Sequence, residues 1–135
     1  MVAVAAAGPL TNFVLAGVGA VALGLLARWA TDGAGIAFLG LSFTYFVLIN
    51  VSLGLFNLLP LPPFDGSHIV EGLLPRAAAE QYRKLRPLGF PMVFILLLVI
   101  PYFWPSLDVF KLVVAPQIRW AMDYYGALAR VVAGV

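Results

Sequence analysis

The sequence predicts an all-α membrane protein, a polytopic helix bundle of three to four membrane segments with a proline-broken helix and a short interfacial helix. Of its 135 residues, 63% are hydrophobic and only 10% are charged, whereas soluble domains contain about 45–50% apolar and about 25% charged residues. Three apolar runs are each long enough to cross the roughly 30 Å hydrocarbon core of a bilayer. We therefore expect residues 1–135 to form a single membrane domain, with the lipid bilayer as a partner.

The composition also narrows the possible partners and chemistry. The formal net charge is +2, and no basic cluster alternates with aromatic residues, so no nucleic-acid partner is expected. The chain contains no cysteine, which excludes disulfides and thiolate sites.

The first predicted span runs from Leu10 to about Ala27, after Pro9, which suits a first helical turn. Its small residues favour close packing against neighbouring helices. Asn12 is the one strong hydrogen-bonding side chain near its start, and we expect it to make a polar contact within the bundle. The small residues include Gly17, Gly19 and Gly24.

The second predicted span, from about Ile36 to Leu59, leads into the segment NLLPLPPFDG at residues 57–66. Asn50, Gly54 and Asn57 recur at i, i+4 and i+7, which places them on one helical face. A polar stripe in a membrane helix faces the protein interior, as a functional site or as a contact between helices.

Behind the break, the sequence predicts a short helix from Ser67 to Leu74 and a basic interfacial helix from Arg76 to Arg86, with a Glu80–Lys84 pair. A third apolar run covers residues 88–104. The last segment, residues 112–132, is amphipathic. It either crosses the membrane with Arg119, Asp123, Gly126 and Arg130 facing inward or lies in the interface.

An acidic side chain in a membrane segment is costly and is a candidate functional group. Asp65 follows three prolines, and irregular backbone at membrane depth is tolerated only when it is buried in protein or lines a wet cavity. The sequence therefore predicts an internal polar site at Asp65, as metal ligand, proton carrier or structural partner. As the residue that opens the short helix, Asp65 is also a candidate N-cap. A self-contained metal site with His68 and Glu71, in a D-x-x-H-x-x-E pattern, is a further alternative.

Two segments, AAGPLTN at residues 6–12 and FNLLPLPPFDGSHI at residues 56–69, together resemble the site-2 protease family of intramembrane zinc metalloproteases. In that family an alanine-glycine-proline segment with a nearby Asn begins one membrane helix, and N-x-x-P-x-P-x-x-D-G carries the third zinc ligand. The resemblance covers essentially the whole chain. The family's H-E-x-x-H motif supplies two zinc-binding histidines and the glutamate base, and it is absent from this sequence. The chain is therefore expected to correspond to the C-terminal half of such a protease.

The resemblance implies a zinc metalloendopeptidase that cleaves membrane-embedded peptide bonds of a transmembrane protein substrate. Asp65 would be the third zinc ligand, and the other ligands would come from a missing N-terminal half or a partner chain. Asn57, Pro60 and Pro62 would bind substrate, with an extended segment 57–64 pairing with the unwound substrate strand.

The resemblance assigns no catalytic residue to this chain itself. Asn12 matches the Asn of the alanine-glycine-proline motif, where a polar bundle contact is expected, and Asn50 is given the same role. Without its front half the isolated chain would expose the polar face of Asn50, Asn57 and Asp65, so we expect it to be poorly stable or to find a partner.

Two other functions stay open from the residues alone. One is a non-catalytic membrane protein, either a degenerate homologue or an assembly subunit. The other is a small transporter or proton-conducting bundle that uses Asp65, although transporters usually show paired broken helices and only one break is evident. The basic residues of loop 60–87 predict that this loop and the N-terminus are cytoplasmic, in what we expect to be a bacterial cytoplasmic membrane.

Overall fold

The computed structural model describes residues 2–30 and 33–135, which form helices joined by turns, without a β-strand in these ranges. The predicted all-α class is confirmed. The helices are α1 (Val2–Trp29), α2 (Ala34–Asn57), α3 (Asp65–Leu73), α4 (Arg76–Arg83), α5 (Gly89–Phe94), α6 (Ile100–Phe103) and α7 (Ala115–Ala133). Short 3-10 or π-helical turns connect the later helices at Arg86–Leu88, Ile95–Val99, Pro105–Leu107 and Phe110–Val114.

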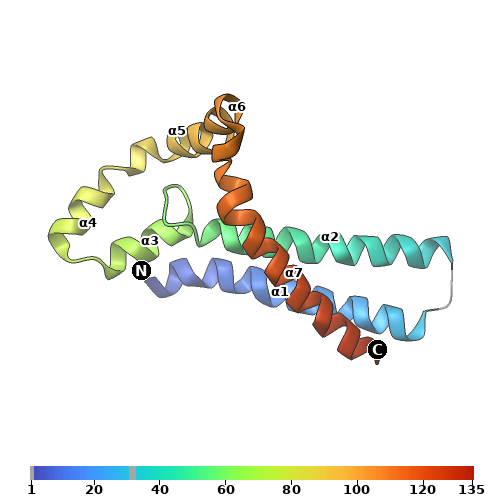
Figure 1. Ribbon diagram of the computed structural model, residues 1–135. Coiled ribbons are helices and arrows are strands. Elements are labelled where there is room, and N and C mark those ends of the chain that lie inside the picture. The colour runs from blue at the N-terminus through green and yellow to red at the C-terminus, as the bar shows by residue number, and fades with distance from the viewer. Residues whose placement is uncertain (1, 31–32) are drawn as a thin grey trace.

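Helices α1 and α2 form a long antiparallel hairpin (Figure 1). Both are long and apolar enough to cross a membrane, as is the stretch Arg76–Phe103, which confirms a membrane helix bundle with three such segments. Helix α2 ends at Asn57 because proline disfavours helical backbone in the residue before it and cannot supply the next donors. Helix α1 begins earlier than predicted, so Pro9 lies inside it and not in its first turn.

The core between α1, α2 and α7 is built from small residues, as the packing of membrane helices favours. A Cβ atom on Gly19 would lie only 2.7 Å from the Phe46 ring, so α2 approaches α1 where the side chain is missing. The buried cluster consists of Ala16, Ala20, Val47, Val51 and Ala121.

Helix α7 packs against α1 through alanines and turns its charged residues outward. Ala121 and Ala129 are buried, and a Cβ atom on Gly24 of α1 would lie 2.5 Å from the Ala129 carbonyl oxygen. The charged residues on α7 are exposed. The alternative in which they face inward is wrong, because only small side chains allow this close approach to α1.

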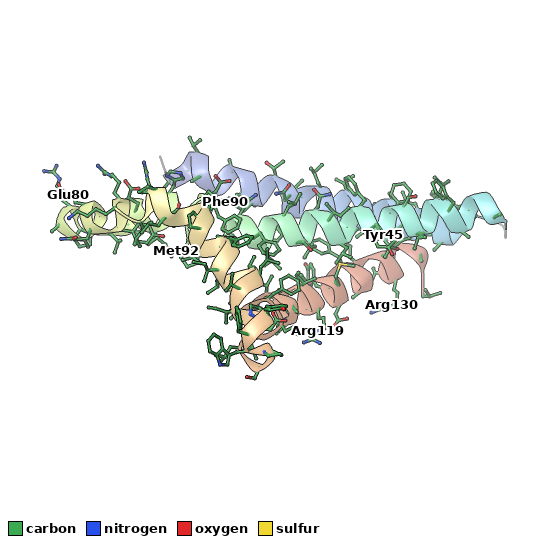
Figure 2. All side chains as sticks on the ribbon, turned by 90° about the horizontal axis from the view of Figure 1, so that it is seen from above. Tyr45, Glu80, Phe90, Met92, Arg119 and Arg130 are labelled. Carbon is green, nitrogen blue, oxygen red and sulfur yellow. The ribbon has the colours of Figure 1, made fainter. Side chains whose placement is uncertain are left out.

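The stretch from α4 to α6 reaches away from the α1–α2 hairpin in both views (Figures 1 and 2). Helix α4 ends at Arg83, three residues earlier than predicted. Lys84 therefore lies beyond the helix, and its Nζ is 3.3 Å from Gln81 Oε1, so the predicted pair with Glu80 is wrong. Pro91 and Pro101 lie in α5 and α6, on either side of the π-helical segment Ile95–Val99. Proline lacks the N–H donor of a regular helix, which fits the irregular helical backbone of this stretch.

The packing of α7 on α1 can be tested with two glycine substitutions. Gly24→Ala should destabilise the protein by about 1–3 kcal/mol, because the new methyl group overlaps Ala129 and Val132. Gly40→Ala is the matched control: its Cβ would meet only Leu26, at 3.9 Å, so it should be neutral or stabilising by up to about 1 kcal/mol. Thermal unfolding in detergent micelles measures both. Equal effects of the two substitutions would contradict the close contact.

Candidate metal centre

The chain between α2 and α3 is folded into turns and delivers Asp65 as the first residue of α3. Backbone hydrogen bonds run from Leu59 N–H to the Phe56 carbonyl and from Phe64 N–H to the Leu61 carbonyl. The extended conformation predicted for residues 57–64 is therefore wrong, because these prolines favour tight turns. Gly66 packs directly on the carbonyl groups of Leu58 and Leu59, where a side chain would not fit.

Asp65 does not cap α3. The N-cap position is Phe64, and no side chain of the described residues caps the helix there. The capping role predicted for Asp65 is therefore wrong, because the helix begins one residue earlier than that role requires. The carboxylate is half-buried, and within the described part of the chain it accepts no hydrogen bond.

The two sequence segments that carry the family resemblance meet at this carboxylate. A Cβ atom on Gly8 of α1 would lie 2.7 Å from Asp65 Oδ2. Gly8 therefore leaves the space that the carboxylate occupies beside α1. The following residue, Pro9, is buried and has no N–H to offer.

Asp65 opens onto a cavity of about 510 Å³ between α1, α3 and the end of α4. The cavity is large enough for several water molecules or for a side chain of another segment. Its lining combines apolar residues of α1 with charged residues of α3 and the α4 region. The lining residues are Val4, Ala5, Asp65, His68, Glu71, Gly72, Arg83 and Arg86.

Glu71 connects α3 to the end of α4 through two arginines. Arg86 Nη2 lies 2.6 Å from Glu71 Oε2, and Arg83 Nε lies 3.0 Å from Glu71 Oε1. Burial of the Glu71 carboxyl raises its pKa, but hydrogen bonds and attraction from the two guanidinium groups outweigh burial, so the net pKa is lowered. Glu71 is thus held as a carboxylate.

Arg86 also determines which histidine tautomer faces the cavity. Its Nη2 lies 3.2 Å from His68 Nδ1, and a guanidinium group can only donate hydrogen bonds. His68 Nδ1 therefore accepts, and the proton of the neutral imidazole sits on Nε2.

These residues fit one metal ligand and not a complete centre. A catalytic zinc site uses three protein ligands, and residues 2–30 and 33–135 contain no group of three histidine, aspartate or glutamate side chains placed to hold a metal ion. The self-contained D-x-x-H-x-x-E alternative therefore fails, because Glu71 is engaged by two arginines. Asp65, with a free carboxylate at a cavity, has the chemistry of a single hard ligand.

The predicted substrate residues lie beside Asp65 but on different surfaces of the turn segment. Asn57 is the last residue of α2 and is half-buried, Pro60 is exposed and Pro62 is buried. A Cβ atom on Gly89 would lie 2.6 Å from Pro62, so the start of α5 covers this proline. The binding roles of the three residues stay predictions.

Sequence reasoning missed Tyr82 of α4. Its hydroxyl donates a hydrogen bond of 2.7 Å to the Pro60 carbonyl, which fastens α4 to the turn segment. The contact joins residues 22 positions apart, and no local sequence pattern marks it. The sequence showed Gly8, Glu71 and Arg86 only as members of other motifs, and it did not predict their contacts around Asp65.

Asn50 and Asn12, which were both predicted to make contacts within the bundle, lie in α2 and α1. Asn50 is buried, and its Nδ2 donates a 2.8 Å hydrogen bond to the Phe46 carbonyl of its own helix. Asn12 is half-buried on α1. Their roles as contacts between helices stay predictions.

The glycine-proline step of α1 and the carboxylate that follows the broken end of α2 thus lie side by side. The chain belongs to the family described as "Peptidase family M50", whose model matches residues 33–100. It is similar to the "Putative zinc metalloprotease YwhC" of Bacillus subtilis (strain 168), with 36% identity over 113 residues. This match covers 79% of the chain and 51% of the relative, so the chain spans about half the length of the curated relative it matches. The search of solved structures gave no match.

The attachment of α3 to α4 should depend on pH. Because the folded-state pKa of Glu71 is lower than its ordinary value of 4.5, the stabilisation is fully present above about pH 4.5 and is lost as the pH falls through the folded value. Amide hydrogen exchange of α4, measured from pH 7 to pH 3, should therefore accelerate relative to α1 in the acid range. Glu71→Gln should remove this dependence, whereas Glu80→Gln, at an exposed position on α4, should keep it. A pH dependence that survives in Glu71→Gln would contradict the assignment.

Proposed function

We propose that the complete protein is an intramembrane zinc metalloendopeptidase of the site-2 type. In this proposal Asp65 is one zinc ligand, and the other ligands come from polypeptide outside these 135 residues. The observation that carries the proposal is the free carboxylate of Asp65, which faces a cavity of about 510 Å³ beside Gly8. Membership of Peptidase family M50 supports it at the level of the family.

The residues of this chain have distinct tasks in the proposed reaction. Bound zinc supplies Lewis acidity and an acidified water for peptide hydrolysis. Asp65 would be one of the residues that hold the ion, and the turns of residues 58–64 fix the position of its side chain. Gly8 leaves room for the carboxylate, and Tyr82 keeps the turn segment attached to α4.

The proposed substrate is a membrane protein segment that becomes unwound near Asp65. Because residues 58–64 form turns, the substrate is recognised by side chains and single backbone groups and not by one continuous strand. Asn57 is the candidate donor and acceptor for an unwound substrate backbone, since its amide carries both kinds of group. Pro60, which is exposed, has no N–H donor that would compete with the substrate backbone, whereas Pro62 is covered by the start of α5 and would act by shaping the turn.

The chain has helices capable of spanning a membrane, and the side on which Asp65 lies is part of the proposal. The basic residues of α4 and the following turn favour the cytoplasmic face, so loop 60–87 and the N-terminus would be cytoplasmic. The membrane would be the bacterial cytoplasmic membrane, in line with the Bacillus relative. The basic residues concerned are Arg76, Arg83, Lys84 and Arg86.

The metal-binding role of Asp65 can be tested in the full-length protein. Asp65→Asn removes a charged ligand, so zinc content should fall and cleavage of a membrane-embedded reporter should drop by at least about 100-fold. Zinc per protein is measured by elemental analysis of the purified sample, independently of cleavage. Asp108→Asn is the matched control: Asp108 pairs with Lys111 in a turn after α6, and its loss should leave both readouts unchanged.

The outcome also separates the peptidase from the other functions. Unchanged zinc content and unchanged cleavage in Asp65→Asn would reject the assignment. Proton flux in liposomes that depends on Asp65 without zinc would favour a conducting bundle. An upstream reading frame with H-E-x-x-H would supply the other ligands, and a frame without it would favour a non-catalytic homologue.

A further inference from the structure

Helix α7 crosses the α1–α2 hairpin obliquely and contacts the middle of α1 (Figure 1). The Tyr125 hydroxyl donates a 2.8 Å hydrogen bond to the Phe13 carbonyl, and the Tyr125 ring lies 3.8 Å from the Cβ position of Gly17. Helix α1 runs from Val2 to Trp29, so this contact is near its centre. Further along, Ala129 packs on Gly24. Where α1 crosses the bilayer, α7 lies beside it within the membrane.

The opposite face of α7 is charged. Arg119, Asp123 and Arg130 recur at i, i+4 and i+11, which places them on one side of the helix, and all three are exposed. Figure 2 shows Arg119 and Arg130 pointing away from α1 and α2. Within residues 2–30 and 33–135 no ion pair involves any of the three.

This charged face is incompatible with contact to lipid tails. Ionised groups at membrane depth face protein or water and pair with one another. Long arginine side chains can reach toward the headgroups, but the short side chain of Asp123 cannot. Asp123 precedes Tyr125 by two residues, or about 3 Å of helix rise, and therefore lies near the depth at which Tyr125 meets the middle of α1.

The segment that completes the site at Asp65 approaches a different side of the molecule. At about 100° per residue, the α1 residues that contact α7, namely Phe13, Gly17 and Gly24, lie roughly 160° around the helix from Gly8. Gly8 is the residue beside Asp65. On the proposed function, the polypeptide that supplies the remaining ligands must reach Asp65, which lies on another side of α1 from the one that carries α7.

We propose that the charged face of α7 binds the same face of a second copy of this chain. Two copies inserted in the same orientation are related by a twofold axis along the membrane normal, so their α7 helices run in the same direction. Arg119 lies about one helical turn before Asp123 on α7, so where the two α7 helices cross, Arg119 of each copy would reach Asp123 of the other with its long side chain. The face carries both signs of charge and is self-complementary, so two reciprocal ion pairs form and neither Asp123 carboxylate faces lipid.

The aromatic residues on the same helix fit this interface. Trp120 and Tyr124 are 73% and 64% exposed, and their rings stack with centroids 6.4 Å apart. Exposed aromatic rings beside a charged pair are typical of interfaces between proteins. At about 100° per residue they lie on one flank of the charged face, where they would border the ion pairs and exclude lipid from that side.

The absence of cysteine from the chain allows a direct test by single-cysteine cross-linking in native membranes. Ala127→Cys, on the charged side of α7, should form a disulfide-linked dimer of twice the protein mass on mild oxidation. Val18→Cys is the control: it is also an exposed position, on α1, on a side away from α7, and it should stay monomeric. This test is independent of the peptidase proposal, because it needs neither zinc nor cleavage.

Charge substitutions in the Ala127→Cys background test the ion pairs. Asp123→Arg or Arg119→Asp alone should abolish most of the dimer, and the two together should restore it, because the reciprocal pairs are rebuilt with exchanged signs. Asp123→Asn should weaken cross-linking without adding repulsion. No dimer with Ala127→Cys, a product of another mass, or a dimer that ignores all charge substitutions would each overturn the proposal.

Discussion

The structure depends on how a broken membrane helix keeps a carboxylate at its end. Prolines stop α2 at Asn57, and the chain turns back so that α3 can begin with Asp65. Backbone groups that leave the helix at membrane depth must be covered by protein. Here neighbouring segments pack closely on them because glycines take up little space. Gly66 sits on the carbonyls of the turn, and Gly8 leaves space for the carboxylate itself. A side chain at either position would move Asp65 from α1.

A second set of contacts, made by α3, α4 and the turn after α4, stabilises this arrangement. Tyr82 is bonded to the Pro60 carbonyl, and Glu71 joins α3 to two arginines. The arginine that binds Glu71 most closely, Arg86, also engages His68. In these contacts the charged groups around Asp65 pair with one another. The Asp65 carboxylate itself has no hydrogen bond within the described residues, as a metal ligand requires.

Two different sides of α1 contact the Asp65 region and α7. One side carries Gly8, Asp65 and the cavity of the proposed peptidase centre. The other side carries α7, whose alanines face α1 and whose charges face outward. A membrane protein can keep charges on an outer helix face only if another protein surface or water covers them. The same physical rule therefore accounts for both the inward site and the proposed contact between copies.

Hydropathy and proline act locally along the chain, so the membrane class, the three long apolar segments and the break at the prolines could be read from the sequence. Asp65 could be singled out there as a candidate ligand, and that role stays a prediction. Only the packing of the helices brings Gly8 beside Asp65 and bonds the Tyr82 hydroxyl to the Pro60 carbonyl. It also pairs Arg86 with Glu71, so that this carboxylate is not available to bind a metal. It also corrected the capping role of Asp65, the extended form of residues 57–64 and the inward charged face of α7. Those features arise from contacts between residues far apart in the chain, and local periodicity carries no information about which distant helix a side chain will meet.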